Sequence, residues 1–147
     1  MNYRPRAIEM LLVEDNPGDV RLIQEALNEG GVTSHIHLAG DGEEAMQFLR
    51  RESPRYSGAR RPDLILLDLN LPRKSGQEVL EEIKTDPALR RIPVMVLTGS
   101  CAPEDLDLVY RLHGNCYIRK PASADQFAEV VRSIGEFWFT VATLPSR

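Results

Sequence analysis

Short apolar runs alternate with amphipathic segments along the chain. Four runs are mainly apolar, as is typical of strands buried on both faces; they are Ile8–Val13, Leu64–Leu67, Pro93–Leu97 and Asn115–Ile118. A fifth segment, Ser34–Ala39, alternates polar and apolar residues, which predicts a half-buried edge strand. The pattern therefore predicts five strands.

Helical spacing follows each predicted strand. Asp19–Glu29 and Gly76–Lys84 place apolar residues on one face of a helix. The other three helices are marked by start signals, namely Asp41 with Glu44, Pro103, and Ser123 with Gln126. Strands that alternate with amphipathic helices favour a parallel sheet covered on both faces, because each crossover places a helix on the sheet. We therefore expect a doubly wound α/β fold.

Length and composition fit one globular domain over residues 1–147. The chain has 42% hydrophobic and 27% charged residues, and at this length a core needs no disulfide or metal to hold it. The net charge of -4 provides no basic field for nucleic acid. Without a run of 18 apolar residues or a cleavable leader, and with only two cysteines, we expect a cytoplasmic protein with no membrane partner.

Two polar features are interpreted as structural. The segment Ser53–Pro62, rich in Pro, Gly, Ser and Arg, is interpreted as a solvated connection of ordinary length. His35 and His37 flank Ile36 in the alternating segment, so both imidazoles are expected to face outward.

Acidic, hydroxyl and amine side chains stand at the ends of the predicted strands. Glu14 and Asp15 follow the first strand and Asp68 the third, while Thr98 and Lys120 follow the fourth and fifth. Ligands bind beyond the carboxyl ends of strands in an open parallel sheet, so these side chains should meet at one edge. Oxygen ligands of this kind suit a hard cation such as Mg2+.

Each acidic residue also has a structural interpretation on its own. Asp15 could form the turn before a Pro-Gly pair, and Asp68 could form an Asx turn. Taken together, three carboxylates would repel one another by about 4 kcal/mol per pair at 4 Å and an effective dielectric constant near 20. A bound cation would relieve that repulsion.

The remaining groups at the same edge suit a phosphoryl ligand. Lys120 supplies a positive charge and the Thr98 hydroxyl a hydrogen-bond donor. A carboxylate, a metal site, an amine and a hydroxyl are what phosphoryl transfer onto an aspartate requires. Asp68 is predicted as the nucleophile, because it alone ends an apolar, central strand.

The sequence resembles the receiver domain of two-component response regulators over nearly its whole length. The matching segments, in the family's order and spacing, are LLVEDNPGD, DGEEA, PDLILLDLNLPRKSG, IPVMVLTGS and YIRKP. The resemblance implies a (βα)5 flavodoxin-like fold whose five-stranded parallel sheet has the order 2-1-3-4-5. It also implies a signalling phosphoacceptor, rather than a turnover enzyme, that receives its phosphoryl group from a sensor histidine kinase.

The resemblance implies a role for each residue of the strand-end set. Those that would bind Mg2+ are Glu14, Asp15, Asp68 and, through its backbone carbonyl, Asn70. Asp68 would accept the phosphoryl group, and Thr98 and Lys120 would contact it. Tyr117 would be the aromatic side chain whose rotamer follows Thr98. The Lys120-Pro121 bond would be cis.

Two further segments, RLHGNCYIRKP and EFWFTVATLP, resemble the small response regulators that accompany bacterial and cyanobacterial phytochromes. This resemblance implies a phytochrome kinase as the partner. A typical receiver is shorter than this chain, and the excess lies in the loop Ser53–Pro62 and a carboxyl tail, 139–147. We therefore expect a stand-alone receiver with no room for a DNA-binding output domain.

The last two helices carry apolar residues that core spacing does not explain. Phe137 and Phe139 fall outside the stripe of the fifth helix, and Leu108 and Leu112 lie off the inner face of the fourth. We therefore expect a symmetric homodimer, biased by phosphorylation, through a face that also includes Tyr117. The alternative is that the tail from residue 140 folds back over this face.

Three other classes of function stay open on the sequence alone. A phosphatase of the haloacid dehalogenase type uses similar groups but has a second Asp two residues after its nucleophile, where this chain has Asn70. A flavin-binding module would need a Gly-, Ser- and Thr-rich phosphate loop where this chain has EDNPGD. A scaffold that is never phosphorylated would not need the complete site.

Overall fold

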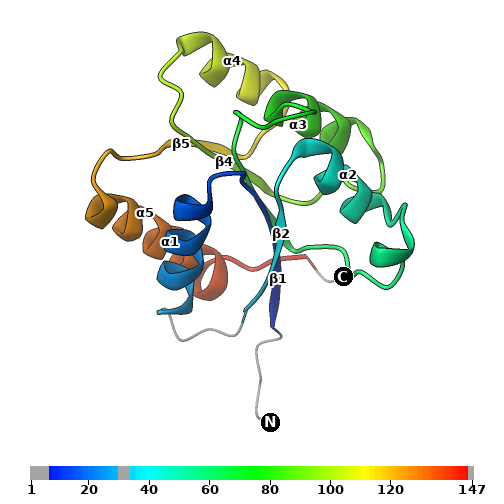
Figure 1. The fold of residues 1–147 in the computed structure, drawn as a ribbon, viewed down its shortest axis with the longest axis horizontal. Coiled ribbons are helices and arrows are strands. Elements are labelled where there is room, and N and C mark those ends of the chain that lie inside the picture. Colours follow the sequence, from blue (N-terminus) through cyan, green and yellow to red (C-terminus); the bar gives the residue numbers. More distant parts are fainter. Residues whose placement is uncertain (1–6, 30–33, 146–147) are drawn as a thin grey trace.

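The five predicted strands form one parallel sheet in the order β2-β1-β3-β4-β5 (Figure 1). The computed structural model describes residues 7–29 and 34–145. The strands are β1 (Ile8–Val13), β2 (Ser34–Ala39), β3 (Leu64–Leu67), β4 (Val94–Thr98) and β5 (Cys116–Arg119). The predicted doubly wound, flavodoxin-like fold and its strand order are thereby confirmed.

Five helices cover the sheet on its two faces (Figure 1). They are α1 (Pro17–Asn28), α2 (Gly42–Arg50), α3 (Gly76–Thr85), α4 (Pro103–Arg111) and α5 (Ala124–Glu136). Because side chains alternate along a strand, Leu11 and Val13 pack toward α2, α3 and α4, whereas Met10 and Leu12 pack toward α1 and α5. No helix in the described ranges is both long and apolar enough to cross a membrane.

The helix starts follow from their capping residues. The Asn16 side chain accepts the Asp19 N–H at 3.1 Å and Pro17 occupies the first turn, so α1 begins two residues before its predicted start. Asp41 caps α2 as predicted, but the Glu44 carboxylate accepts the N–H of Gly40 rather than that of Asp41. A complete capping box is found at the start of α3 instead.

The backbone of β3 is fixed to β1 at both of its ends. The Asp63 N–H donates to the Glu9 carbonyl at 2.7 Å, and the Asp68 N–H donates to the Val13 carbonyl at 3.0 Å. The residue after Asp68 is held from the other side as well, because its carbonyl accepts the N–H of Gly76 at 2.9 Å. The backbone that carries Asp68 therefore has little freedom to shift.

The edge strand β2 is tied to β1 by side chains. The carboxylate of Glu9, a residue only 4% exposed, lies 3.0 Å from Nδ1 of His35 and 2.8 Å from Nε2 of His37. Burial raises the pKa of Glu9, but its hydrogen bonds with the two imidazoles outweigh this and lower that pKa overall. The His35 and His37 side chains are 59% and 40% exposed, so the expectation that they face outward is confirmed. One ring nitrogen of each nevertheless contacts the buried Glu9 carboxylate.

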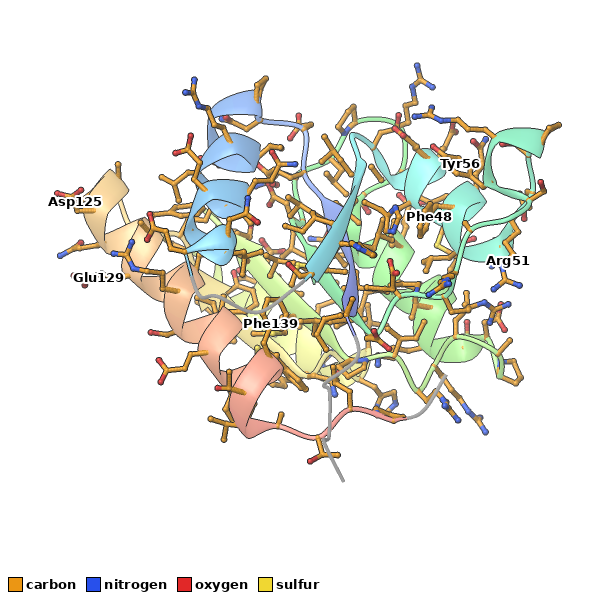
Figure 2. The ribbon with its side chains drawn as sticks, turned by 90° about the horizontal axis from the view of Figure 1, so that it is seen from below. Phe48, Arg51, Tyr56, Asp125, Glu129 and Phe139 are labelled. Atoms are coloured by element: carbon orange, nitrogen blue, oxygen red, sulfur yellow. The ribbon has the colours of Figure 1, made fainter. Side chains whose placement is uncertain are left out.

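The connection Ser53–Pro62 is more ordered than its composition indicates. It contains a short 3-10 turn, Pro54–Tyr56. The Tyr56 hydroxyl donates to Glu44 at 2.9 Å, and its ring meets that of Phe48 edge to face at 5.4 Å (Figure 2). The interpretation as a purely solvated loop is therefore corrected: an aromatic side chain anchors its first half to α2.

The carboxyl end differs from expectation in two respects. A π-helical turn, Phe137–Val141, continues α5, closed by the Ala142 N–H on the Phe137 carbonyl at 2.7 Å, so the tail begins after 141 rather than at 139. Beyond the turn, Pro145 lines the same cavity as Pro62 and Pro93 at the amino ends of the strands, so this part of the tail does not cover the face of α4, β5 and α5. Its last two residues lie outside the described residues.

No cis peptide bond occurs in the described part of the chain. The cis Lys120-Pro121 bond implied by the family resemblance is therefore a wrong prediction. The trans form is the intrinsically preferred one for an X-Pro bond. With it, the Lys120 N–H still donates to the Thr98 carbonyl at 2.8 Å, which brings the ends of β4 and β5 together.

Substitution of Gly76 by Ala tests the close approach of α3 to the strand end. A Cβ at Gly76 would lie 2.2 Å from the Asp68 carbonyl oxygen and 2.5 Å from the Leu69 Cα, both backbone atoms that cannot yield easily. We expect Gly76→Ala to lower the free energy of unfolding by about 2 kcal/mol or more. Urea denaturation measures it. Gly58→Ala is the matched control, because nothing lies within 4 Å of its Cβ position; equal losses in both variants would contradict the packing argument.

Candidate functional site

Three carboxylates converge at the carboxyl edge of the sheet, as predicted. Glu14 and Asp15 follow β1, Asp68 follows β3, and one ligand oxygen from each lies within 4.8 Å of the others. Glu14 and Asp68 are buried while Asp15 is exposed, so the cluster opens to water on one side. This set of hard oxygen donors fits a divalent cation that keeps part of its water shell.

The Lys120 ammonium group holds this cluster together. Its Nζ donates to Glu14 at 2.9 Å and to Asp68 at 3.1 Å. The Lys120 side chain is only 12% exposed, so these ion pairs are largely shielded from water. One ammonium group thus connects the two buried acidic side chains.

Asp19 is a third partner of Lys120 that the sequence reasoning missed. Its carboxylate accepts a hydrogen bond from Lys120 Nζ at 2.9 Å, reaching the site from the first turn of α1. Its side chain is 29% exposed, more than that of either other partner. The available signal was its place in the EDNPGD segment, one helical turn after Asp15.

Burial and hydrogen bonding shift the pKa values of Glu14 and Asp68 in opposite directions. Burial, together with the neighbouring Asp68 carboxylate, raises the pKa of Glu14 to about 8. Burial would also raise the pKa of Asp68, but the hydrogen bond from Glu14 and the charge of Lys120 outweigh it and hold that pKa below its usual value. Burial lowers the pKa of Lys120, yet its hydrogen bonds to Asp19 and Glu14 raise that pKa overall. The lowered pKa favours the ionised form of Asp68.

Thr98 and Tyr117 lie on the side of the site toward α4. Thr98 is fully buried at the end of β4, and its hydroxyl accepts the Ser100 N–H at 3.4 Å. The Tyr117 hydroxyl donates to the Ser100 carbonyl at 3.0 Å, while the Ser100 hydroxyl donates to Asp105 at the start of α4. Ser100 therefore connects the predicted switch residues to α4.

Asp68 also makes the Asx-type turn contact that was the structural alternative to a site role. The Asn70 N–H donates to Asp68 Oδ1 at 3.3 Å, which is an Asx-type contact. Since Asp68 Oδ2 meets Lys120, the two oxygens of this carboxylate have separate partners. Turn formation and site formation are compatible here.

The residues expected at a dimer interface differ in how far they are exposed. Leu108 and Phe137 are 37% and 50% exposed, whereas Leu112 and Tyr117 pack partly against the core beneath α4. Phe139 lies with Leu27 and Gly135 between α1 and α5, where its own chain covers part of its ring (Figure 2). Leu108 and Phe137 are thus the more accessible members of the set.

A family model for the response regulator receiver domain matches residues 10–132. The chain is a member of the response regulator receiver domain family. Response regulator Rcp1 of Synechocystis sp. is 45% identical to it over 137 residues, covering 93% of this chain and 92% of that protein. The resemblance carried by the sequence motifs is confirmed, and so is the phosphoacceptor function of a response regulator.

Solved structures of related receiver domains share the same fold. The phosphorylated cyanobacterial phytochrome response regulator RcpA superposes with a TM-score of 0.93 at 53% identity, covering 96% of this receiver domain and all of that chain. The Mn(2+)-bound form of Rcp1 superposes with a TM-score of 0.91 at 45% identity, covering 95% and 99% of the two chains. A divalent ion is thus bound by a close structural relative, and receiver domains bind such ions in an acidic pocket.

Replacement of Asp15 by Asn tests the carboxylate cluster as a metal site. Asp15 is exposed and lies outside the Lys120 ion pairs, so its loss should remove a ligand charge and leave the fold intact. We expect Asp15→Asn to weaken Mn2+ binding about tenfold or more, as measured by isothermal titration calorimetry. Asp107→Asn, an exposed residue of α4, is the control for charge alone. An unchanged Mn2+ affinity in Asp15→Asn would place the ion elsewhere.

Proposed function

We propose that this receiver domain accepts a phosphoryl group on Asp68 from a sensor histidine kinase in a Mg2+-dependent reaction. The observation that carries the proposal is the buried Asp68 carboxylate, with its lowered pKa, between Lys120 and two further acidic side chains. Glu14, Asp15, Asp68 and the Asn70 carbonyl would hold the ion. When bound, Mg2+ would neutralise charge on the transferred phosphoryl group.

The chain's own residues account for the remaining requirements of the reaction. An Asp68 carboxylate oxygen attacks phosphorus, a new O–P bond forms, and the P–N bond of the donor phosphohistidine breaks with its electron pair leaving on the imidazole. Lys120 already donates to Asp68 and would follow the negative charge onto a phosphoryl oxygen. The buried Thr98 hydroxyl would donate to another.

Phosphorylation would be read out through Thr98, Ser100 and Tyr117. A Thr98 hydroxyl that turns toward the phosphoryl group would give up its contact with the Ser100 N–H. The Ser100 carbonyl holds Tyr117 and the Ser100 hydroxyl holds Asp105, so a shift of this loop reaches β5 and α4 together. The face formed by α4, β5 and α5 would change its affinity for a partner or for a second copy.

The proposed partner kinase is a phytochrome. RcpA is described as a cyanobacterial phytochrome response regulator and AtBRR as a bacteriophytochrome response regulator; AtBRR superposes with a TM-score of 0.73 at 35% identity.

We propose that this receiver domain acts in the cytoplasm as a signalling phosphoacceptor, without enzymatic turnover and without nucleic acid as a direct partner.

Phosphorylation by acetyl phosphate tests the proposed acceptor. Acetyl phosphate carries a transferable phosphoryl group, with acetate as the leaving group. In the presence of Mg2+ we expect intact-mass spectrometry to show one added phosphoryl group, absent in Asp68→Asn and absent when EDTA removes the metal. Asp107→Asn should be modified like the wild type. An adduct that persists in Asp68→Asn would identify another acceptor, and phosphate release without an adduct would indicate rapid hydrolysis of the aspartyl phosphate.

A charged residue at Leu108 tests the proposed homodimer. Leu108 is 37% exposed on α4, so Leu108→Asp should not disturb the core but should prevent apolar contact across a two-fold axis. We expect the variant to remain monomeric after phosphorylation, whereas the wild type shifts toward a dimer, as measured by size exclusion with light scattering. Leu38→Asp, 44% exposed on the opposite sheet edge, is the control. Dimers of unchanged stability in Leu108→Asp would move the interface elsewhere.

A further inference from the structure

A cavity of about 680 Å3 lies at the amino ends of β3 and β4, at the opposite end of the sheet from Asp68. Its walls come from the end of α2, from the residues before β3, from the segment between α3 and β4, and from Pro145 of the tail. Cavities of this size accommodate small organic ligands. The four residues of β3 lie between Asp63 in the cavity wall and Asp68. At about 3.3 Å per residue the two ends are roughly 16 Å apart.

Four arginines line the cavity, namely Arg51, Arg60, Arg61 and Arg91. The one acidic residue of the lining, Asp63, is buried, and its Oδ2 already accepts the Glu9 N–H at 2.9 Å. The lining therefore has an excess of positive charge, although the whole chain has a net charge of -4. An anionic ligand is the chemistry that this concentration of guanidinium groups favours.

Two of the cavity arginines, Arg51 and Arg60, differ from nearby Arg50 in their ion pairs. Nearby Arg50 pairs with Glu82. Arg51 and Arg60, in contrast, are exposed and make no side-chain ion pair with any described residue. Their guanidinium groups are available to a ligand.

Arg61 presents a further unsatisfied donor. Its Nη1 donates to the Ala88 carbonyl at 2.8 Å, which fixes the guanidinium group in the wall. Its Nε is buried and has no hydrogen-bond partner among the described residues. A buried donor without a partner costs free energy that an acceptor atom would recover.

Arg51 occupies a backbone position at which glycine is the usual residue. It ends α2 with φ 56°, in the left-handed region, and projects from the end of that helix (Figure 2). The fold thus accepts a conformation that costs a side chain some strain, and the side chain placed there is a cavity guanidinium.

The rest of the lining is apolar and rigid. Pro62, Ile92, Pro93 and Pro145 supply flat hydrocarbon surface beside the arginines. Such a wall suits a planar ring, whereas the arginines suit phosphate oxygens, which they bind with two parallel hydrogen bonds. We propose that this cavity binds a phosphorylated small molecule of the nucleoside polyphosphate class, independently of the phosphoryl group on Asp68.

The binding test is a titration followed by 1H-15N correlation spectra of the 15N-labelled full chain. ATP, tripolyphosphate and adenosine are compared in a buffer with EDTA, so that no metal brings phosphate to Asp68. We expect ATP to shift amides of residues 51–63 and 87–93 with a dissociation constant below about 1 mM. Tripolyphosphate should shift the same amides more weakly, and adenosine more weakly still.

Arg51→Gln with Arg60→Gln is the test variant, because both side chains are exposed and their loss leaves the core untouched. We expect its affinity for ATP to fall at least tenfold. Arg21→Gln with Arg111→Gln removes the same charge from α1 and α4 and should bind ATP like the wild type. Circular dichroism verifies that both variants fold.

Three outcomes would overturn the proposal wholly or in part. Shifts centred on residues 68 and 120 would show that the phosphate binds at the Asp68 edge instead. Equal ATP affinity in wild type and Arg51→Gln/Arg60→Gln would remove the arginines from the site. Tripolyphosphate that binds as tightly as ATP would restrict the ligand to an inorganic polyanion and exclude a role for the apolar wall.

Discussion

Charge compensation by one buried lysine is the constraint on which the site depends. Parallel strands end at a common edge, so a sequence that places carboxylates after β1 and β3 forces like charges together. The Lys120 ammonium group, delivered by β5, offsets that repulsion while leaving Asp68 ionised. Removing one partner of such a buried ion pair lowers the free energy of unfolding by far more than the intact pair contributes to it. A change in these charged side chains would therefore affect the stability of this edge as well as its chemistry.

The framework around Asp68 separates what is fixed from what can move. Its amide is bonded to β1, and the start of α3 closes against the residue after it. By contrast, the loop after β4 is held by a few side-chain contacts centred on Ser100. A phosphoryl group on Asp68, as proposed, would have to be accommodated by side chains and by that loop. Ser100 of the loop contacts both β5 and α4.

The fold and most of the site follow from the sequence because both depend on short-range patterns. Apolar runs, helix caps and the residue after each strand are local features, and parallel topology alone then brings Asp68, Thr98 and Lys120 to one edge. The motif resemblance added strand order and family, whereas its cis peptide bond is absent here. The interface residues stay predictions.

What the sequence could not supply depends on contacts between distant segments. Asp19 reaches Lys120 only because the fold brings the first turn of α1 close to the residue that follows β5, 101 residues later. The arginine cavity combines four segments, none of which is distinctive alone. Glu9 stands inside an apolar run, and nothing in that run reveals that β2 supplies its two partners.

Those two imidazole contacts also fix the alignment of the edge strand. β2 is only partly buried, and a weakly apolar edge strand is prone to slide along its neighbour. A slip by one residue would turn His35 and His37 to the opposite face and leave the Glu9 carboxylate buried without a counterpart, at the cost of an unsatisfied charge. One acidic residue in the middle of the sheet thus selects a single register for β2, and with it the point from which α2 departs.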